Sequence, residues 1–243
     1  MGLKLERQKQ RHILLSIAYK LKKILPLNKE KRFKLFLDLE WIFDRFANEE
    51  SFRIYSEDSH PARIYSKRFI LDKIATNHLV FDLGCKYGEI SNYIAEKAKH
   101  VTAIDHDKDA INIAKDRYKR NNLTFENGEA YDYLSNQDFK YDVLILSHIL
   151  EHLDDPKKFL SKFKQFFQFI YIEVPDFERH YLNQYRLDKN INLIYSDNDH
   201  VSEFDRLEIK GLLQSCGITI QKEEYRFGVQ KLWCKIKKNE TKQ

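Results

Sequence analysis

The sequence predicts an α/β fold: a doubly wound, mostly parallel sheet with an antiparallel edge strand, preceded by N-terminal helices. Three observations predict it. From residue 78 onward, short apolar runs alternate with segments of helical periodicity. These runs are continuously apolar, which is typical of strands buried on both faces. Only seven Gly and four Pro interrupt 243 residues, so the elements should be long and their connections short.

The N-terminal region, residues 1–77, is expected to form a basic arm and a helical lid. Apolar residues at helical spacing predict a first helix within 3–27, which Pro26 ends. A second helix is expected from residue 29 to 51, and its apolar face should pack onto the following domain as a lid or buttress. A third helix, over 60–75, should lead into the first strand.

The second region, residues 78–238, should hold the sheet. Its parallel strands are predicted at 79–83, 100–105, 122–126, 141–146 and 168–174, with intervening helices at 88–97, 107–119, 129–134 and 156–167. A helix over 203–217 should end at Gly217. Two strands around Phe227 and Gly228 should form a terminal hairpin that supplies the antiparallel edge. Residues 239–243 are expected to be a flexible tail.

Charge and cysteine content narrow the function classes. Residues 1–34 hold 11 Lys/Arg against two acids, a net charge of +9, while the remainder carries a net charge of −4. The body therefore lacks the basic face of a nucleic-acid-binding protein. Three widely spaced cysteines suit a reducing cytoplasm. No apolar run approaches the roughly 18 residues that a membrane span requires, so we expect a cytoplasmic protein.

The segment "DLGCKYGEIS" (82–91) is the expected ligand-binding turn, because ligands bind at the carboxyl ends of parallel strands. Gly84 and Gly88 would let a ligand approach the backbone closely. Asp105, at the end of the next strand, could accept hydrogen bonds from ribose hydroxyls. The turn lacks the G-x-G-x-x-G pattern of dinucleotide sites, but a nucleoside without a phosphate demands less.

These segments resemble the S-adenosylmethionine (SAM) binding core of class I methyltransferases, which has a Rossmann-like fold. Asp82, Gly84 and Gly88 match the family's first motif, roughly D-x-G-x-G-x-G, and Lys86 replaces its middle glycine. We expect the lysine to point outward into water; the alternative is an inward lysine that meets the methionyl carboxylate or an anionic acceptor. Three further segments match: "LEHL" (150–153), "IYIEVPD" (170–176) and "DHVSEF" (199–204).

The resemblance implies S-adenosylmethionine as the cofactor and assigns residues to its site. Asp105 would bind the ribose, and Glu129 with the small Ala130 would lie beside the adenine. The full set of cofactor-binding residues expected on this basis is Asp82, Gly84, Cys85, Gly88, Asp105, His106, Glu129, Ala130 and Ser147.

The resemblance also places catalysis on the loop after the fourth strand. His152, with Glu151, could take a proton from an acceptor hydroxyl during methyl transfer; alternatively, His152 only packs over the cofactor. Some relatives bind a divalent metal through nearby acids, but His148 stands where they often have an acid, so we expect no metal. The expected acceptor-binding residues are His148, His200, Tyr195 and Arg63, and for His200 and Arg63 a purely structural role is the alternative.

The predicted function is methylation of a hydroxyl on a sugar, glycan or other small molecule, as in polysaccharide biosynthesis. The basic arm, residues 1–34, could attach the enzyme peripherally to the inner membrane face, or could dock on its own domain. Two alternatives stay open: an RNA methyltransferase, against which the acidic body argues, and a catalytically degenerate scaffold, for which Lys86 is the only support.

Overall fold

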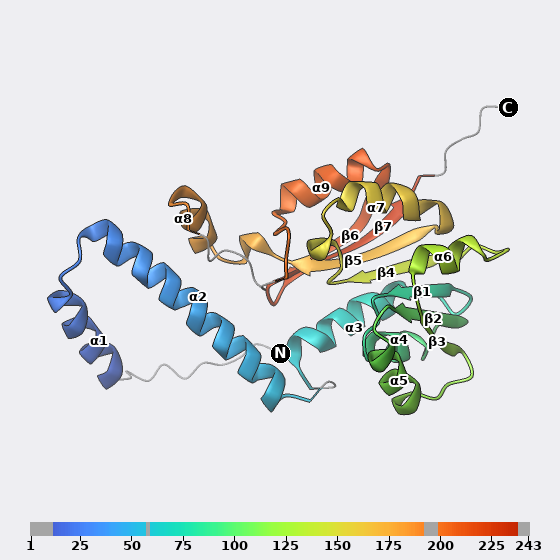
Figure 1. The fold of residues 1–243 in the computed structure, drawn as a ribbon, viewed down its shortest axis with the longest axis horizontal. Coiled ribbons are helices and arrows are strands. Elements are labelled where there is room, and N and C mark those ends of the chain that lie inside the picture. Colours follow the sequence, from blue (N-terminus) through green and yellow to red (C-terminus); the bar gives the residue numbers. More distant parts are fainter. Residues whose placement is uncertain (1–11, 57–58, 192–198, 238–243) are drawn as a thin grey trace.

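The computed structural model describes residues 12–56, 59–191 and 199–237. Within them, seven strands form one sheet in the order β3-β2-β1-β4-β5-β7-β6 (Figure 1). Strands β1 to β5 are parallel, while β7 runs antiparallel to both β5 and the edge strand β6. The predicted sheet and its terminal hairpin are therefore confirmed. The strand bounds are β1 Leu79–Leu83, β2 His100–Asp105, β3 Leu123–Asn127, β4 Val143–Ser147, β5 Phe169–Pro175, β6 Ile218–Arg226 and β7 Val229–Ile236.

Helices cover both faces of the sheet, which explains why its central strands are apolar throughout. One face carries α3 (Pro61–Lys73), α4 (Glu89–Ile94) and α5 (Lys108–Arg117), and the other carries α6 (Ala130–Ser135), α7 (Pro156–Phe163) and α9 (Arg206–Ser215) (Figure 1). Alternate residues of one strand enter opposite cores: Val80 packs with Ile70 of α3, and Phe81 packs on the α7 side. Because β1 lies between β2 and β4, the strand order reverses at its carboxyl end, where such folds bind ligands.

Several helices differ from the expected bounds. The segment predicted as 88–97 is helical only over Glu89–Ile94, and the segment predicted as 156–167 ends as α7 at Phe163, followed by the 3₁₀ turn η2 (Lys164–Phe166). Two further 3₁₀ turns, η1 (Leu150–His152) and η3 (Phe177–Arg179), follow β4 and β5. Helix α8 (Leu182–Asp188) was not predicted, because its residues are mostly polar and its stability comes from a partner helix.

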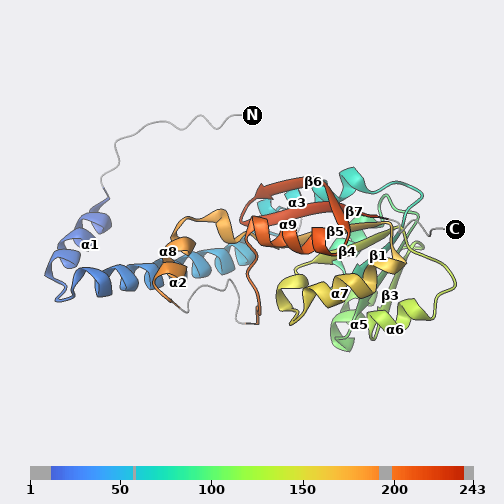
Figure 2. The same cartoon turned by 90° about the horizontal axis from the view of Figure 1, so that it is seen from above.

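That partner is the long helix α2 (Lys29–Ile54), which projects from the sheet domain together with α1 (Ile13–Ile24) (Figures 1 and 2). Arg186 of α8 is 1% exposed and donates hydrogen bonds to the backbone oxygen of Leu37, at 2.8 Å, and to Glu40. Two aromatic side chains of the apolar face of α2 stay exposed, Phe43 at 63% and Phe46 at 55%. Helix α2 contacts α8 and η3, and its C-terminal end packs on the start of α3, where the rings of Phe52 and His60 stack at 4.2 Å and Ser51 Oγ lies 3.0 Å from His60 Nε2.

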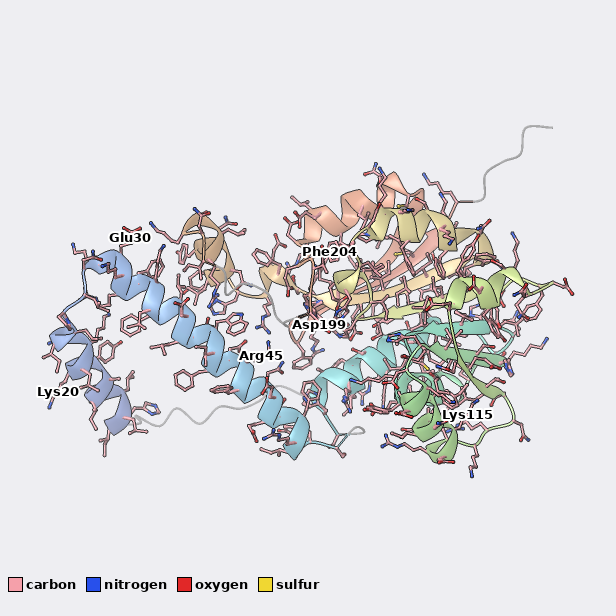
Figure 3. All side chains as sticks on the ribbon, viewed as in Figure 1. Lys20, Glu30, Arg45, Lys115, Asp199 and Phe204 are labelled. Atoms are coloured by element: carbon pink, nitrogen blue, oxygen red, sulfur yellow. The ribbon has the colours of Figure 1, made fainter. Side chains whose placement is uncertain are left out.

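Helix α1 buries none of its residues, although it is strongly amphipathic. Its exposed apolar side chains are Ile13, Leu14, Leu15, Ile17, Tyr19, Leu21 and Ile24. Lys22 reaches over the ring of Phe36 on α2, and Lys20 lies on the outer side of α1 (Figure 3). No helix among the described residues is long and apolar enough to cross a membrane. The rest of the predicted first helix and the predicted tail at 239–243 lie outside the described residues.

Candidate active site

The turn between β1 and α4 follows the expected glycine pattern. Gly84 and Gly88 have φ angles of +71° and +79°, in the left-handed region that favours glycine. A Cβ atom at Gly88 would lie 2.5 Å from two ring carbons of Phe125, so the position also excludes a side chain by space. A Cβ atom at Gly84 would lie 2.4 Å from Cδ1 of Ile149. The loop after β4 therefore packs directly onto the turn after β1.

Lys86 occupies the same turn without blocking it. Its φ angle is +47°, so a lysine holds the left-handed conformation that the family gives to glycine, at a cost of roughly 1–2 kcal/mol. The side chain is exposed, and its Nζ lies 5.5 Å from the centre of the Tyr87 ring. The expected outward orientation is thus what the structure has, and the backbone N–H remains free to bond Asp105.

Asp105 holds the turn and the end of β2 together. Its Oδ2 accepts a 2.8 Å hydrogen bond from the N–H of Lys86, and its Oδ1 accepts one of 2.9 Å from the N–H of Asp107. The side chain is 9% exposed, and each oxygen retains a second lone pair for a ligand. Asn127, at the end of β3, donates 3.0 Å hydrogen bonds to the backbone oxygens of Asp105 and His106, a contact that the sequence did not predict.

Asp82 is the most strongly perturbed acid of the turn. It is 3% exposed and accepts a 2.5 Å hydrogen bond from the Ser91 hydroxyl of α4. Burial raises its pKa to about 7; the Ser91 hydrogen bond opposes the shift, and the nearby charge of Asp105 adds to it. Asp82 therefore titrates near neutral pH, and a cationic ligand beside it would favour the carboxylate.

The other predicted cofactor residues lie around the same strand ends. Cys85 is half-buried, and burial raises the pKa of its thiol, so it is not an activated nucleophile. His106 is 86% exposed, with Nδ1 3.6 Å from Asp105 Oδ1. Glu129 is exposed at the start of α6, directly before the half-buried Ala130. Ser147 ends β4.

A second polar cluster follows β4. His148 has a φ angle of +56°, and its ring lies between two buried carboxylates: Nδ1 is 3.0 Å from Glu151 Oε1 and Nε2 is 3.3 Å from Glu173 Oε1. Burial opposes charge on His148, but the hydrogen bonds to Glu151 and Glu173 outweigh it and raise the pKa of His148 to about 10. His148, predicted to bind the acceptor, is therefore an imidazolium whose hydrogen bonds join two buried acids.

Glu173 was missed because it lies within the otherwise apolar strand β5. Burial alone would raise its pKa, but the hydrogen bond and charge of His148 outweigh burial and lower it. Its carboxylate also accepts hydrogen bonds from the hydroxyls of Ser66, at 3.0 Å, and Tyr171. A single glutamate within an otherwise apolar strand is the signal that could have identified Glu173, since a buried carboxylate requires hydrogen-bond donors or an opposite charge nearby.

The predicted catalytic pair lies next to His200. Glu151 is fully buried, and its backbone oxygen accepts hydrogen bonds from the N–H groups of Val201 (2.8 Å) and Ser202 (3.1 Å). This anchors the 199–203 segment to η1, and the rings of His152 and His200 meet edge-to-face at 4.7 Å. Ligand atoms of Glu151, His152 and His200 lie within 4.8 Å of one another, so these three could hold a metal ion.

Of the other two predicted acceptor residues, only Arg63 is described, and it lies outside this cluster. Arg63, on α3, pairs with Glu89 at the start of α4 (3.1 Å) and lies over the Phe52 ring. Its position near the first turn of α4 is compatible with either alternative considered for it. Tyr195 lies outside the described residues.

Comparison with known proteins bears on the family and the fold of the chain. Residues 58–223 match the family described as "Methyltransferase domain". Two curated relatives are similar in part: a ribosomal protein L11 methyltransferase of Thermosipho africanus (33% identity; 43% of this chain and 40% of that protein) and a ubiquinone biosynthesis O-methyltransferase of Aeromonas salmonicida (30%; 33% and 35%). The chain thus spans well under half the length of these relatives.

Among solved structures, magnesium protoporphyrin IX methyltransferase (ChlM) from Synechocystis PCC 6803, with bound SAH, aligns with a TM-score of 0.56 at 19% identity. The alignment covers 80% of this chain and 94% of that one, which supports the fold. With the family match extending over more than half of the sequence, and with the glycine turn and Asp105 arranged at the switch point of the sheet, the chain belongs to the class I methyltransferases, the family whose cofactor is S-adenosylmethionine.

Proposed function

We propose that this chain transfers a methyl group from S-adenosylmethionine to a hydroxyl of a sugar, glycan or other small molecule. The observation that carries the proposal is the contact of Ile149 with Gly84, which sets the His148–His152 loop against the cofactor turn. The groups proposed to bind the acceptor and those proposed to bind the cofactor are thereby neighbours. The partial similarity to a ubiquinone biosynthesis O-methyltransferase supports an oxygen acceptor.

The residues of the chain would have separate roles in cofactor binding and in proton transfer. The cofactor supplies a methyl group on a positively charged sulfur. Asp105 would accept hydrogen bonds from ribose hydroxyls, and Gly84 and Gly88 would allow close approach to the backbone. His152 would take the proton of the acceptor hydroxyl, while most of the rate would come from orienting the acceptor oxygen toward the methyl group.

A cavity on the α2 side has a lining that suits a sugar, although none of its lining residues belongs to the cofactor turn or to the His148–His152 loop. It measures about 240 Å³ and lies where α2, η3, α8 and the β6–β7 turn meet. Its lining combines the indole of Trp41 with paired charges, Asp44 with Arg179 and Glu40 with Arg186, and the amide of Asn183. An aromatic face surrounded by fixed donors and acceptors suits a ring that carries several hydroxyls.

We further propose that α1 and the start of α2 contact an anionic membrane surface. The apolar side chains of α1 face outward, and lysines flank them. An amphipathic helix of this composition binds at a membrane interface through its apolar face, and each nearby Lys adds about 1 kcal/mol. A lipid-linked acceptor at the inner membrane face would fit this arrangement.

Two measurements test the enzymatic proposal. Calorimetry with S-adenosylmethionine establishes binding, and release of S-adenosylhomocysteine in the presence of hydroxyl acceptors establishes turnover. We expect His152→Ala to lower kcat by roughly 10²–10⁴-fold while leaving the cofactor Kd unchanged. Cofactor binding without turnover across sugar, quinol and RNA acceptors would favour the degenerate scaffold, and turnover on RNA alone would replace the sugar proposal.

A further inference from the structure

We propose that Glu151, His152 and His200 form a binding site for a divalent transition-metal ion on the acceptor side of the fold. Their ligand atoms lie within 4.8 Å of one another, although His200 comes from a segment far from η1 in the sequence. One carboxylate oxygen and two imidazole nitrogens make a ligand set found in protein metal sites. The expectation of no metal rested on His148 alone and did not include His200.

An independent observation points to a cation at this place. Oε2 of Glu151 is buried and has no hydrogen-bond partner among the residues that the structure describes, while Glu151 itself is 0% exposed. A buried charged oxygen without a partner costs free energy, because it has left water without gaining a hydrogen bond. Oε1 of the same carboxylate is bonded to His148, so the unsatisfied atom is the one a metal ion would bind.

Each proposed ligand is also held by a further group. Nδ1 of His200 is 2.9 Å from Glu203 Oε1, and both side chains are 7% exposed. Nδ1 of His152 is 3.2 Å from the backbone oxygen of Asp199 and 3.4 Å from its Oδ2. At metal sites the second nitrogen of a ligand histidine is characteristically held by a carboxylate or carbonyl in this way, which fixes the ring orientation.

The ligand types indicate which ions would bind. Imidazole suits Zn²⁺, Cu²⁺, Fe²⁺ and Ni²⁺, whereas Mg²⁺, Ca²⁺ and Mn²⁺ prefer oxygen ligands. Three protein ligands would leave coordination positions for water or for an acceptor. The use of the ion rests on the proposed function: a cation here would lower the pKa of an acceptor hydroxyl. Binding of the ion does not depend on methyl transfer and can be measured without it.

The experiment uses the full chain, stripped of metals by chelation and dialysis, without cofactor or acceptor. Zn²⁺ binding is measured by calorimetry and Co²⁺ binding by its visible absorption. We expect one ion per chain, and His200→Ala and Glu151→Gln should each weaken binding by roughly 10–100-fold. His78→Ala, at the opposite end of β1, is the matched control and should bind as the wild type does. Millimolar Mg²⁺ should not compete.

Thermal melting distinguishes lost ligands from lost folding. His200→Ala and Glu151→Gln should both keep a cooperative transition without metal, and added Zn²⁺ should raise the Tm of the wild type and of His78→Ala only. If Glu151→Gln fails to fold, His200→Ala decides the question alone. Sub-stoichiometric binding by the wild type, or wild-type affinity in His200→Ala, would overturn the proposal. Absence of methyl-transfer activity would neither support nor contradict the proposed metal site.

Discussion

The N–H of Lys86 donates a 2.8 Å hydrogen bond to Oδ2 of Asp105, which joins the turn after β1 to the end of β2. The bond uses only the backbone of Lys86, whose side chain lies outside over Tyr87. A lysine at the family's middle-glycine position therefore preserves the polar contact that fixes the turn. The departure from the motif affects the conformational energy of one residue more than the shape of the site.

Lys86→Gly should consequently leave the affinity for S-adenosylmethionine within about threefold of the wild type. Glycine relieves roughly 1–2 kcal/mol of left-handed strain but adds about 0.5–1 kcal/mol of unfolded-state entropy, so stability should change little. Calorimetry measures the affinity and urea unfolding the stability. Binding by Lys86→Gly but not by the wild type would identify a degenerate site.

Asp105→Ala should weaken cofactor binding by roughly 10–100-fold, since hydrogen bonds to a charged group contribute about 1.5–3 kcal/mol. Asp107→Ala is the control two residues away. Asp107 caps α5 by accepting hydrogen bonds from the N–H groups of Asp109 and Ala110, so its loss should cost about 1 kcal/mol of stability. Asp107→Ala should not change cofactor affinity. Equal losses of affinity in both variants would show that Asp105 acts only through stability.

The pKa of Asp82 predicts a pH dependence of cofactor binding. Burial raises the pKa of Asp82 from 3.8 to about 7 in the folded protein. As the pH rises between these two values, Asp82 lowers the free energy of unfolding progressively, because the unfolded chain ionises first. Above about pH 7 it lowers the free energy of unfolding no further. A cationic ligand requires the carboxylate, so affinity for S-adenosylmethionine should rise roughly tenfold from pH 6 to pH 8 and level off above. Calorimetry across this range measures it. Asp82→Asn should bind weakly and without this slope; an unchanged slope would mean that another group titrates.

The sequence was most informative where one physical rule acts alone. Continuous apolar runs located the parallel strands because both faces of the sheet are covered, and the glycines of the turn marked positive φ. Helix α8 could not be predicted, since Arg186 stabilises it through Leu37 and Glu40 of a distant helix. His200 likewise joins Glu151 only through the fold. Local patterns carry no information about which distant polar groups will meet.

Two glycines provide a matched test of the turn. Gly88→Ala should destabilise the protein by roughly 1–3 kcal/mol, because its φ angle is +79° and the added Cβ would lie 2.5 Å from the Phe125 ring. Gly211→Ala, on α9, would meet no atom of the described part of the chain within 4 Å and should raise the free energy of unfolding by about 0.5–1 kcal/mol. Urea unfolding gives both values. If Gly88→Ala leaves the free energy of unfolding unchanged, the turn can rearrange. Cofactor binding to this variant would then be measured.

The exposed apolar face of α1 predicts binding to anionic vesicles. Leu14 is 82% exposed, so Leu14→Glu should not disturb folding, yet it removes about 1.5–3 kcal/mol of burial on the membrane and should weaken vesicle binding roughly ten- to hundredfold. Ser16→Glu adds the same charge at a polar position of the same helix and should weaken binding by about fivefold. Co-sedimentation with phosphatidylglycerol-containing and neutral vesicles measures this. The contrary outcome is that the wild type binds neither kind of vesicle and sediments as a dimer that Leu14→Glu dissociates. In that case a second copy of the chain covers this face of α1.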